Sequence, residues 1–166
     1  MAQVFLSLGS NLGDCRNTLS VAIMVIDRKI GRVTAQSALY QAEPWGFSSD
    51  HWFYNQVIMV ETNDSLWQVF STIQEIEQNF GRDKKTVANI YADRMLDIDI
   101  LAYDQKVINT WELCVPHPKM ALRRFILEPL CDIAPTWVHP VLRKPVHMLL
   151  LECTDDKKVL KTVLKP

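Results

Sequence analysis

The spacing of apolar residues along this chain switches between two periods, and the order of the switches restricts the fold more than any other feature. Apolar and polar residues alternate over 3–8, as the side chains of a strand do. Residues 33–41 and 53–61 are also predicted as strands, the second because it is rich in β-branched and aromatic residues. Apolar residues recur every three or four positions over 14–30 and 64–80, which predicts a helix after the first strand and another after the third.

A fourth strand is predicted over 95–103, so the order of elements is β-α-β-β-α-β. This order is typical of a ferredoxin-like core, an α+β fold in which an antiparallel sheet carries both helices on one face. Asn63 or Asp64 is expected to cap the second helix. Shorter helices, predicted over 120–129 and 146–153, form a C-terminal extension over an edge or end of the sheet.

Composition excludes several classes of protein. The 166 residues suit a single domain over 1–166, and 18 basic against 19 acidic residues argue against a protein that coats nucleic acid. The four cysteines show no metal-binding spacing, which indicates reduced thiols and a cytoplasmic protein. The sequence has neither a signal-peptide pattern nor an apolar run of the roughly 20 residues that span a bilayer.

The segment 96–101, Leu-Asp-Ile-Asp-Ile-Leu, carries the clearest chemical signal. On a strand its apolar side chains face the core, and Asp97 and Asp99 lie side by side on the other face. Adjacent carboxylates repel each other unless cations lie between them, and Mg²⁺ takes carboxylate and phosphate oxygens. The alternative is a solvated strand face with ion pairs to Arg82 or Arg94.

The residues before this strand favour the magnesium interpretation. Arg82 and Arg94 bracket a basic loop that includes Lys85, and arginine forks suit phosphate oxygens. Gln74 and Glu77 lie three residues apart on the preceding helix and therefore share a face. Taken alone, Glu77 is expected to be an ordinary solvated helix residue.

Two further clusters carry candidate binding residues. His117 stands between prolines, in a stiff loop, before Arg123 and Phe125; it suits a phosphate or a base, and its alternative is a surface histidine. The segment 43–47 and the following strand gather aromatic residues around an amide, which would suit a flat heterocycle; the alternative is a cover over the sheet. The residues of this second cluster are Pro44, Trp45, Gly46, Phe53 and Asn55.

Taken together, these motifs resemble the 6-hydroxymethyl-7,8-dihydropterin pyrophosphokinase family of folate biosynthesis. The resemblance implies a ferredoxin-like fold and a reaction in which the pterin's hydroxymethyl oxygen attacks the β-phosphorus of MgATP, so that pyrophosphate is transferred and AMP leaves. The matching segments occur in family order: FLSLGSNLGD (5–14), YQAEPWG (40–46), FYNQV (53–57), QEIEQNFGR (74–82), RMLDIDIL (94–101), VINTWELCVPHPKM (107–120) and RRFILEPLCDIAP (123–135).

The resemblance also implies roles for individual residues. Asp97 and Asp99 would bind two Mg²⁺ ions, Arg82 and Arg94 would engage the phosphates, and Asn55 would hydrogen-bond the pterin edge. Asp97 is the one candidate to accept the hydroxyl proton, unless the metal ions acidify the hydroxyl enough. The other implied contacts are Gln74, Glu77, Lys85, Ile100, His117 and Arg123 for ATP, and Pro44, Trp45, Gly46, Phe53, Tyr91 and Phe125 for the pterin.

The chain departs from the family pattern at Ala42, Tyr91 and Asp93, where threonine, tryptophan and proline are usual. These departures concern loop closure and pterin affinity, because the 44–52 and 82–94 loops are expected to act as lids. They leave the expected metal and phosphate ligands in place.

Three other functions remain possible interpretations of the residues alone. Another two-metal nucleotidyl or phosphoryl transferase would share the aspartates and arginines but not the aromatic loop. An RNA-binding module would need aromatic residues and a basic face on the central strands. A regulatory ligand-binding domain would not need arginines beside paired carboxylates. The expected partners are ATP and hydroxymethyl-dihydropterin, with neither nucleic acid nor membrane; other folate-pathway enzymes are a further candidate.

Overall fold

The computed structural model describes residues 1–81 and 92–162. The elements of this part, in chain order, are β1 (Ala2–Ser10), α1 (Cys15–Lys29), β2 (Arg32–Gln36), β3 (Tyr40–Ala42), β4 (Phe53–Thr62), α2 (Leu66–Asn79), β5 (Asp97–Tyr103), β6 (Ile108–Asn109), β7 (Cys114–Val115), a 3₁₀ turn (Met120–Leu122), α3 (Arg124–Ile133), α4 (Val146–Glu152) and β8 (Val159–Lys161).

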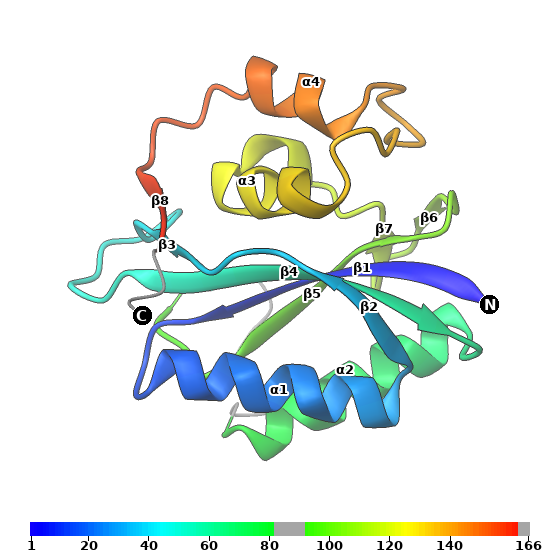
Figure 1. Ribbon diagram of the computed structural model, residues 1–166, viewed down its shortest axis with the longest axis horizontal. Helices are drawn as coiled ribbons and strands as arrows, with labels where there is room; N and C mark the ends of the chain where they lie inside the picture. The colour runs from blue at the N-terminus through cyan, green and yellow to red at the C-terminus, as the bar shows by residue number, and fades with distance from the viewer. Residues whose placement is uncertain (82–91, 163–166) are drawn as a thin grey trace.

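An antiparallel sheet lies at the centre of the molecule (Figure 1). Its strands follow the order β5-β1-β4-β3-β8, and β2 pairs with β4 beside β3. The predicted α+β class is therefore confirmed, and the order β5-β1-β4-β2 agrees with the split βαβ arrangement. β1 lies between β4 and β5, so residues of these strands meet across it.

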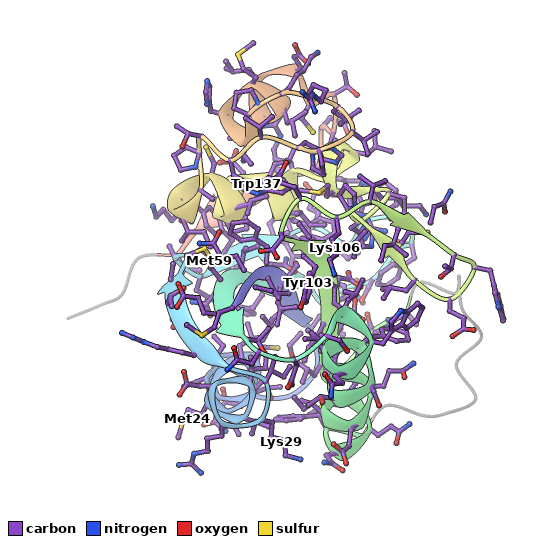
Figure 2. The ribbon with its side chains drawn as sticks, turned by 90° about the vertical axis from the view of Figure 1, so that its right-hand side faces the viewer. Met24, Lys29, Met59, Tyr103, Lys106 and Trp137 are labelled. Carbon is purple, nitrogen blue, oxygen red and sulfur yellow. The ribbon has the colours of Figure 1, made fainter. Side chains whose placement is uncertain are left out.

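Helices cover both faces of the sheet. α1 and α2 lie on one face, as expected, and α3 and α4 are stacked on the opposite face (Figure 1). The C-terminal extension therefore covers a face, and the expectation that it packs over an edge or end is wrong. Figure 2 shows Met59 and Trp137 on the α3 side of the sheet and Met24 on α1 below it. Trp137 packs edge-on against Phe5 of β1, with ring centroids 5.4 Å apart.

The two helices on the first face begin with side-chain caps. Asp14 accepts the main-chain N–H of Asn17 at 3.2 Å at the start of α1. Ser65 caps α2 in a capping box: its hydroxyl accepts the Gln68 N–H at 3.3 Å, and the Gln68 side chain accepts the Ser65 N–H at 2.7 Å. The expected caps, Asn63 or Asp64, precede the helix instead.

The strand predicted over 33–41 and the C-terminal tail both differ from expectation. The first is divided into β2 and β3, which pair with different halves of β4. In the tail, for which the sequence predicts no strand, Val159–Lys161 form β8, an added edge strand beside β3. Among the residues that the structure describes, none belongs to a helix long and apolar enough to cross a membrane.

Candidate functional site

β5 presents its two aspartates on the face opposite its apolar residues. Ile98 and Ile100 are buried in the core that α1 and α2 cover, whereas Asp97 and Asp99 are partly exposed. The strand periodicity predicted from the sequence is therefore confirmed. β5 is an edge strand of the sheet, so a ligand can approach these carboxylates from the side as well as from above.

Asn55 is brought to the same face as Asp97 by the register of the sheet. Gly9 of β1 lies opposite Asp97 on one side and opposite Asn55 on the other. Directly opposed residues of antiparallel strands share a face, so the two polar residues stand about 10 Å apart, two strand spacings, over Gly9. A β-carbon on Gly9 would lie 2.9 Å from Asn55 Oδ1, so glycine leaves the room that Asn55 occupies.

The Asn55 side chain is buried with an unused hydrogen-bond donor. The residue is only 3% exposed, and its amide nitrogen has no hydrogen-bond partner among the described residues. Burying an amide donor without an acceptor costs about 1–3 kcal/mol, so such groups are rare unless a ligand or water completes them. A ligand or a water molecule on this face would complete the donor.

Glu77 connects α2 to β5. The residue is buried, and its Oε2 accepts the main-chain N–H of Ile98, between the two aspartates, at 3.1 Å. The expectation of an ordinary solvated residue is therefore wrong. Gln74, which is one turn earlier on α2, is exposed and does not line the hollow described next.

A hollow of about 290 Å³ lies along β5, between α2 and the β6–β7 hairpin. Its floor is apolar, and Glu77, Asp99 and His117 supply polar groups at its sides. Ile100 and His117 of this lining were predicted as site residues from the sequence, but Trp111 was not. The Trp111 side chain is 95% exposed. The hollow is lined by Phe70, Ile73, Glu77, Ile98, Asp99, Ile100, Trp111, Glu112, Leu113, Cys114, His117 and Pro118.

His117 is held as a neutral imidazole. Burial, with a smaller contribution from the Arg123 charge, lowers the pKa of His117 to about 4. Its Nδ1 accepts the Lys119 N–H at 3.1 Å, so the ring proton resides on Nε2. Nε2 lies 4.0 Å from Asp99 Oδ2 and is therefore a donor directed toward the carboxylate side of the hollow.

Arg123 joins the aromatic loop to the start of α3. Its guanidinium carbon lies 4.7 Å from the Trp45 ring centroid and 5.6 Å from that of Phe125, and the residue is buried. Lys119 is also near Trp45, at 5.7 Å. Two predicted clusters, the aromatic loop and the residues after His117, therefore meet at one place.

The remaining aromatic-loop residues lie beside this contact. Phe53, at the start of β4, packs edge-on against Phe47, with ring centroids 6.1 Å apart. Pro44 is buried, whereas Gly46 is exposed and has a φ of 82°, a left-handed conformation that favours glycine.

Arg94 lies at the entrance to β5 and contacts the first aspartate. Its Nη1 donates to Asp97 Oδ1 at 3.0 Å, which is an ion pair that the alternative interpretation, a solvated strand face, predicts. Arg82, Lys85 and Tyr91, predicted for the same site, lie outside the described residues.

The chemistry of Asp97 and Asp99 suits a metal ion that substrate phosphates help to bind. Within 1–81 and 92–162, no group of three or more histidine, cysteine, aspartate or glutamate side chains could hold a metal ion. A pair of carboxylates still fits Mg²⁺, which keeps water ligands and takes substrate phosphate oxygens rather than a full protein cage.

The comparisons with known proteins decide the family. The model of the 7,8-dihydro-6-hydroxymethylpterin-pyrophosphokinase (HPPK) family matches residues 5–135. The chain belongs to this family. A 2-amino-4-hydroxy-6-hydroxymethyldihydropteridine pyrophosphokinase of Porphyromonas gingivalis is 41% identical over 146 residues, which cover 87% of this chain and 99% of that protein. The Aquifex aeolicus protein of the same name is 35% identical and covers 88% of this chain and 89% of its own length.

Other similar proteins are longer than this chain. The folic acid synthesis protein fol1 of Pneumocystis carinii is 38% identical over 83% of this chain, but the match covers 18% of that protein. A solved HPPK-DHPS structure of Plasmodium falciparum matches with a TM-score of 0.73 and 16% identity, over 92% of this chain and 43% of the other. This chain thus spans less than half of that structure, whose similarity supports the fold.

These findings confirm the family, the enzyme class and the α+β fold expected from the sequence. The family's activity is the ATP-dependent transfer of pyrophosphate to the hydroxymethyl group of 6-hydroxymethyl-7,8-dihydropterin, in folate biosynthesis. The family match and the named relatives confirm this function, which was expected for the chain from its sequence.

Proposed function

We propose that ATP binds along β5 and that the pterin binds over β4, with Gly9 of β1 between the two substrates. The observation that carries the proposal is the buried Asn55 amide, whose nitrogen lacks a hydrogen-bond partner among the described residues and which stands in register with Asp97 across Gly9. A pterin on Asn55 would therefore place its hydroxymethyl group within reach of a phosphate chain on Asp97 and Asp99.

On the ATP side, we assign the hollow along β5 to the nucleotide. Its volume suits part of a nucleotide. Its apolar floor with few polar groups is typical of ligand sites. Glu77 uses one carboxylate oxygen on the Ile98 N–H and so fixes the strand that bears the aspartates. His117 donates from Nε2 and Arg123 adds positive charge, and both suit phosphate oxygens.

On the pterin side, we assign the ring to the space among the aromatic residues near Asn55. Phe125 and Trp45 both contact the Arg123 guanidinium, which supports a common pocket for them. Pro44, Gly46 and Phe53 would line it further. Tyr91 and Lys85 stay predictions for pterin and ATP, respectively, as does Gln74, whose exposed position gives it no contact with the hollow.

Asp97 and Asp99 would hold the Mg²⁺ ions that accompany ATP. Bound there with the phosphates, these ions would neutralise charge on the triphosphate. The pterin hydroxyl gives its proton to Asp97 or to solvent and its oxygen forms a bond to the β-phosphorus; the bond from that phosphorus to the oxygen on the α-phosphate breaks, and AMP leaves with that oxygen. Arg94, next to Asp97, and Arg82 would stabilise the charge that develops during transfer.

Two substitutions test this division. We expect Asn55→Ala to raise KM for hydroxymethyl-dihydropterin about tenfold and to leave MgATP binding unchanged, because it removes a hydrogen bond to the pterin alone. We expect Asp97→Ala to abolish turnover. Steady-state kinetics and calorimetric titration with MgATP measure the two effects. An equal loss of affinity for both substrates in Asn55→Ala, or normal turnover in Asp97→Ala, would contradict the assignment.

A third substitution tests Arg94. Arg94→Ala should slow transfer in a single turnover far more than it weakens either substrate, since the arginine acts on charge that develops in the transition state. Rapid-quench measurement of AMP with saturated enzyme gives the transfer rate directly. A rate near that of the wild type would remove Arg94 from the chemistry.

We also propose that residues 1–166 act as one pyrophosphokinase domain in the cytoplasm. The described residues pack on a common sheet, which supports the single domain. Association with other folate-pathway enzymes is a further part of the proposal. The solved neighbours named HPPK-DHPS carry two enzyme names in one chain, which supports it.

A further inference from the structure

Asn11, directly after β1, is a hydrogen-bonding centre that the reaction does not explain. The residue is 4% exposed, and every polar group of its side chain is used. Its Oδ1 accepts the Arg94 N–H at 2.7 Å, and its own main-chain N–H donates to the Arg94 carbonyl at 3.0 Å. The backbone of Arg94 is therefore held on both sides by a rigid residue at the end of the central strand.

The amide nitrogen of Asn11 makes the second half of this arrangement. It donates to the His51 carbonyl at 3.1 Å and to Asp93 Oδ1 at 2.7 Å. The same carboxylate oxygen of Asp93 accepts the Ser49 hydroxyl at 2.7 Å. Asp93, which immediately precedes Arg94, is thus hydrogen-bonded both to Asn11 and to the loop that carries Trp45 and Gly46.

From this geometry we propose that Asp93 is a positioning residue, which links the pterin-binding loop, residues 43–52, to the position of Arg94. The Asp93 carboxylate fixes the 43–52 loop through Ser49, and it fixes the chain before Arg94 through Asn11. Arg94 in turn reaches Asp97 at 3.0 Å. Hydrogen bonds to an ionised carboxylate are about twice as strong as neutral ones, so one oxygen can hold both segments.

The inference rests on the proposed function, because it assumes that the 43–52 loop lines the pterin pocket and that Arg94 acts on phosphate. It adds a residue to which no contact with either substrate is assigned. The competing explanation is that Asp93 only stabilises the folded chain. In that case Asp93→Ala would lower the free energy of unfolding and would weaken the binding of pterin and MgATP alike.

The test compares three variants of Asp93 and its partner. Asp93→Ala removes the acceptor, and we expect pterin affinity and kcat each to fall about tenfold, whereas the Kd for MgATP stays within twofold. Asp93→Asn keeps an acceptor oxygen but loses the charge, so it should restore part of both. Ser49→Ala should weaken pterin binding, and adding it to Asp93→Ala should cost little more, because both substitutions break one link. Asp50→Ala, an exposed carboxylate of the same loop, is the matched control.

Calorimetric titration with pterin in the presence of a non-hydrolysable MgATP analogue reads the coupling without turnover, and thermal unfolding reads stability. Unchanged pterin affinity and kcat in Asp93→Ala would overturn the inference. So would an equal loss of MgATP and pterin affinity, or failure of Asp93→Asn to restore either quantity. A wild-type protein that makes no AMP would instead contradict the proposed function, and the titrations would still decide the role of Asp93.

Discussion

At the scale of single residues, the predictable part of the site is the part that depends on strand periodicity. Asp97 and Asp99 lie where alternation places them, because a strand fixes its two faces by itself. Glu77 could not be placed in this way, because its partner is the Ile98 N–H on another element, 21 residues away in sequence. The contact between Asn11 and Asp93 could not be predicted for the same reason, because it joins segments separated by 82 positions; from the sequence, Asp93 is only a departure from the family pattern.

Gly9 gives a prediction at this scale. Gly9→Ala would place a β-carbon 2.9 Å from Asn55 Oδ1 and 3.6 Å from the Phe53 ring, so the asparagine must move. We expect pterin KM to rise about tenfold and the unfolding free energy to fall by about 1–2 kcal/mol, while MgATP binding is kept. Kinetics and urea unfolding measure these quantities.

A double variant identifies the cause. In a protein that already carries Asn55→Ala, Gly9→Ala should have little further effect on pterin KM, because the displaced side chain is gone. If Gly9→Ala alone binds pterin as the wild type does, the close packing of Gly9 on Asn55 is irrelevant to recognition.

At the scale of elements, the helices and the long strands were predicted well, whereas the short strands at the β3 side of the sheet were not. α1, α2 and β5 follow apolar spacing, which a sequence displays directly. The division of 33–41 into β2 and β3 depends on β4, which pairs with each in turn. β8 depends on β3 in the same way: three residues become a strand only because an edge is available to receive them.

Removal of the edge strand β8 should destabilise the protein. A chain ending at Asp156 loses β8, together with the hydrogen bonds between Lys158 and Glu43 and from Thr162 to the Leu39 carbonyl. Each such bond contributes about 1 kcal/mol net, so we expect a loss of about 2–4 kcal/mol in the free energy of unfolding, measured in urea.

Lys161→Ala is the control for the truncation. Its ion pair with Asp132, at 3.6 Å, is largely exposed and should contribute little. A truncated chain as stable as the full one would mean that β8 does not stabilise β3.

At the scale of the whole molecule, the proposed site uses both sides of the edge strand β5: α2 lines the hollow, whereas Asn55 and Asp97 lie on the α3 side. The α1–α2 side is a continuous apolar core, whereas the α3 side combines a second core with Asn55, Asp97 and Asp99 at one end. Which face α3 and α4 would cover could not be read from their short apolar segments. Only the packing of residues such as Trp137 on Phe5 decides it.

The second face carries a histidine that should make stability depend on pH. Burial lowers the pKa of His139, whose Nδ1 accepts the N–H groups of Val141 and Leu142 at 3.1 and 3.0 Å. As pH falls below the usual value near 6.5, the unfolded chain takes up this proton before the folded one, so stability declines. Asn in place of His139 can accept the same bonds without titrating.

We therefore expect the unfolding free energy of the wild type to drop between pH 7 and 5, and His139→Asn to drop by less. Urea unfolding at several pH values measures the difference and cancels the contribution of carboxylates common to both proteins. Parallel pH profiles would show that His139 does not contribute.

The central claim is that this chain moves pyrophosphate, and not a single phosphoryl group, from ATP to a pterin. The direct measurement is product analysis after incubation with MgATP and 6-hydroxymethyl-7,8-dihydropterin. We expect AMP and the pterin pyrophosphate in equal amounts, and no product when the pterin or the magnesium is withheld. ADP as the nucleotide product, or no pterin-dependent product from a correctly folded protein, would contradict it.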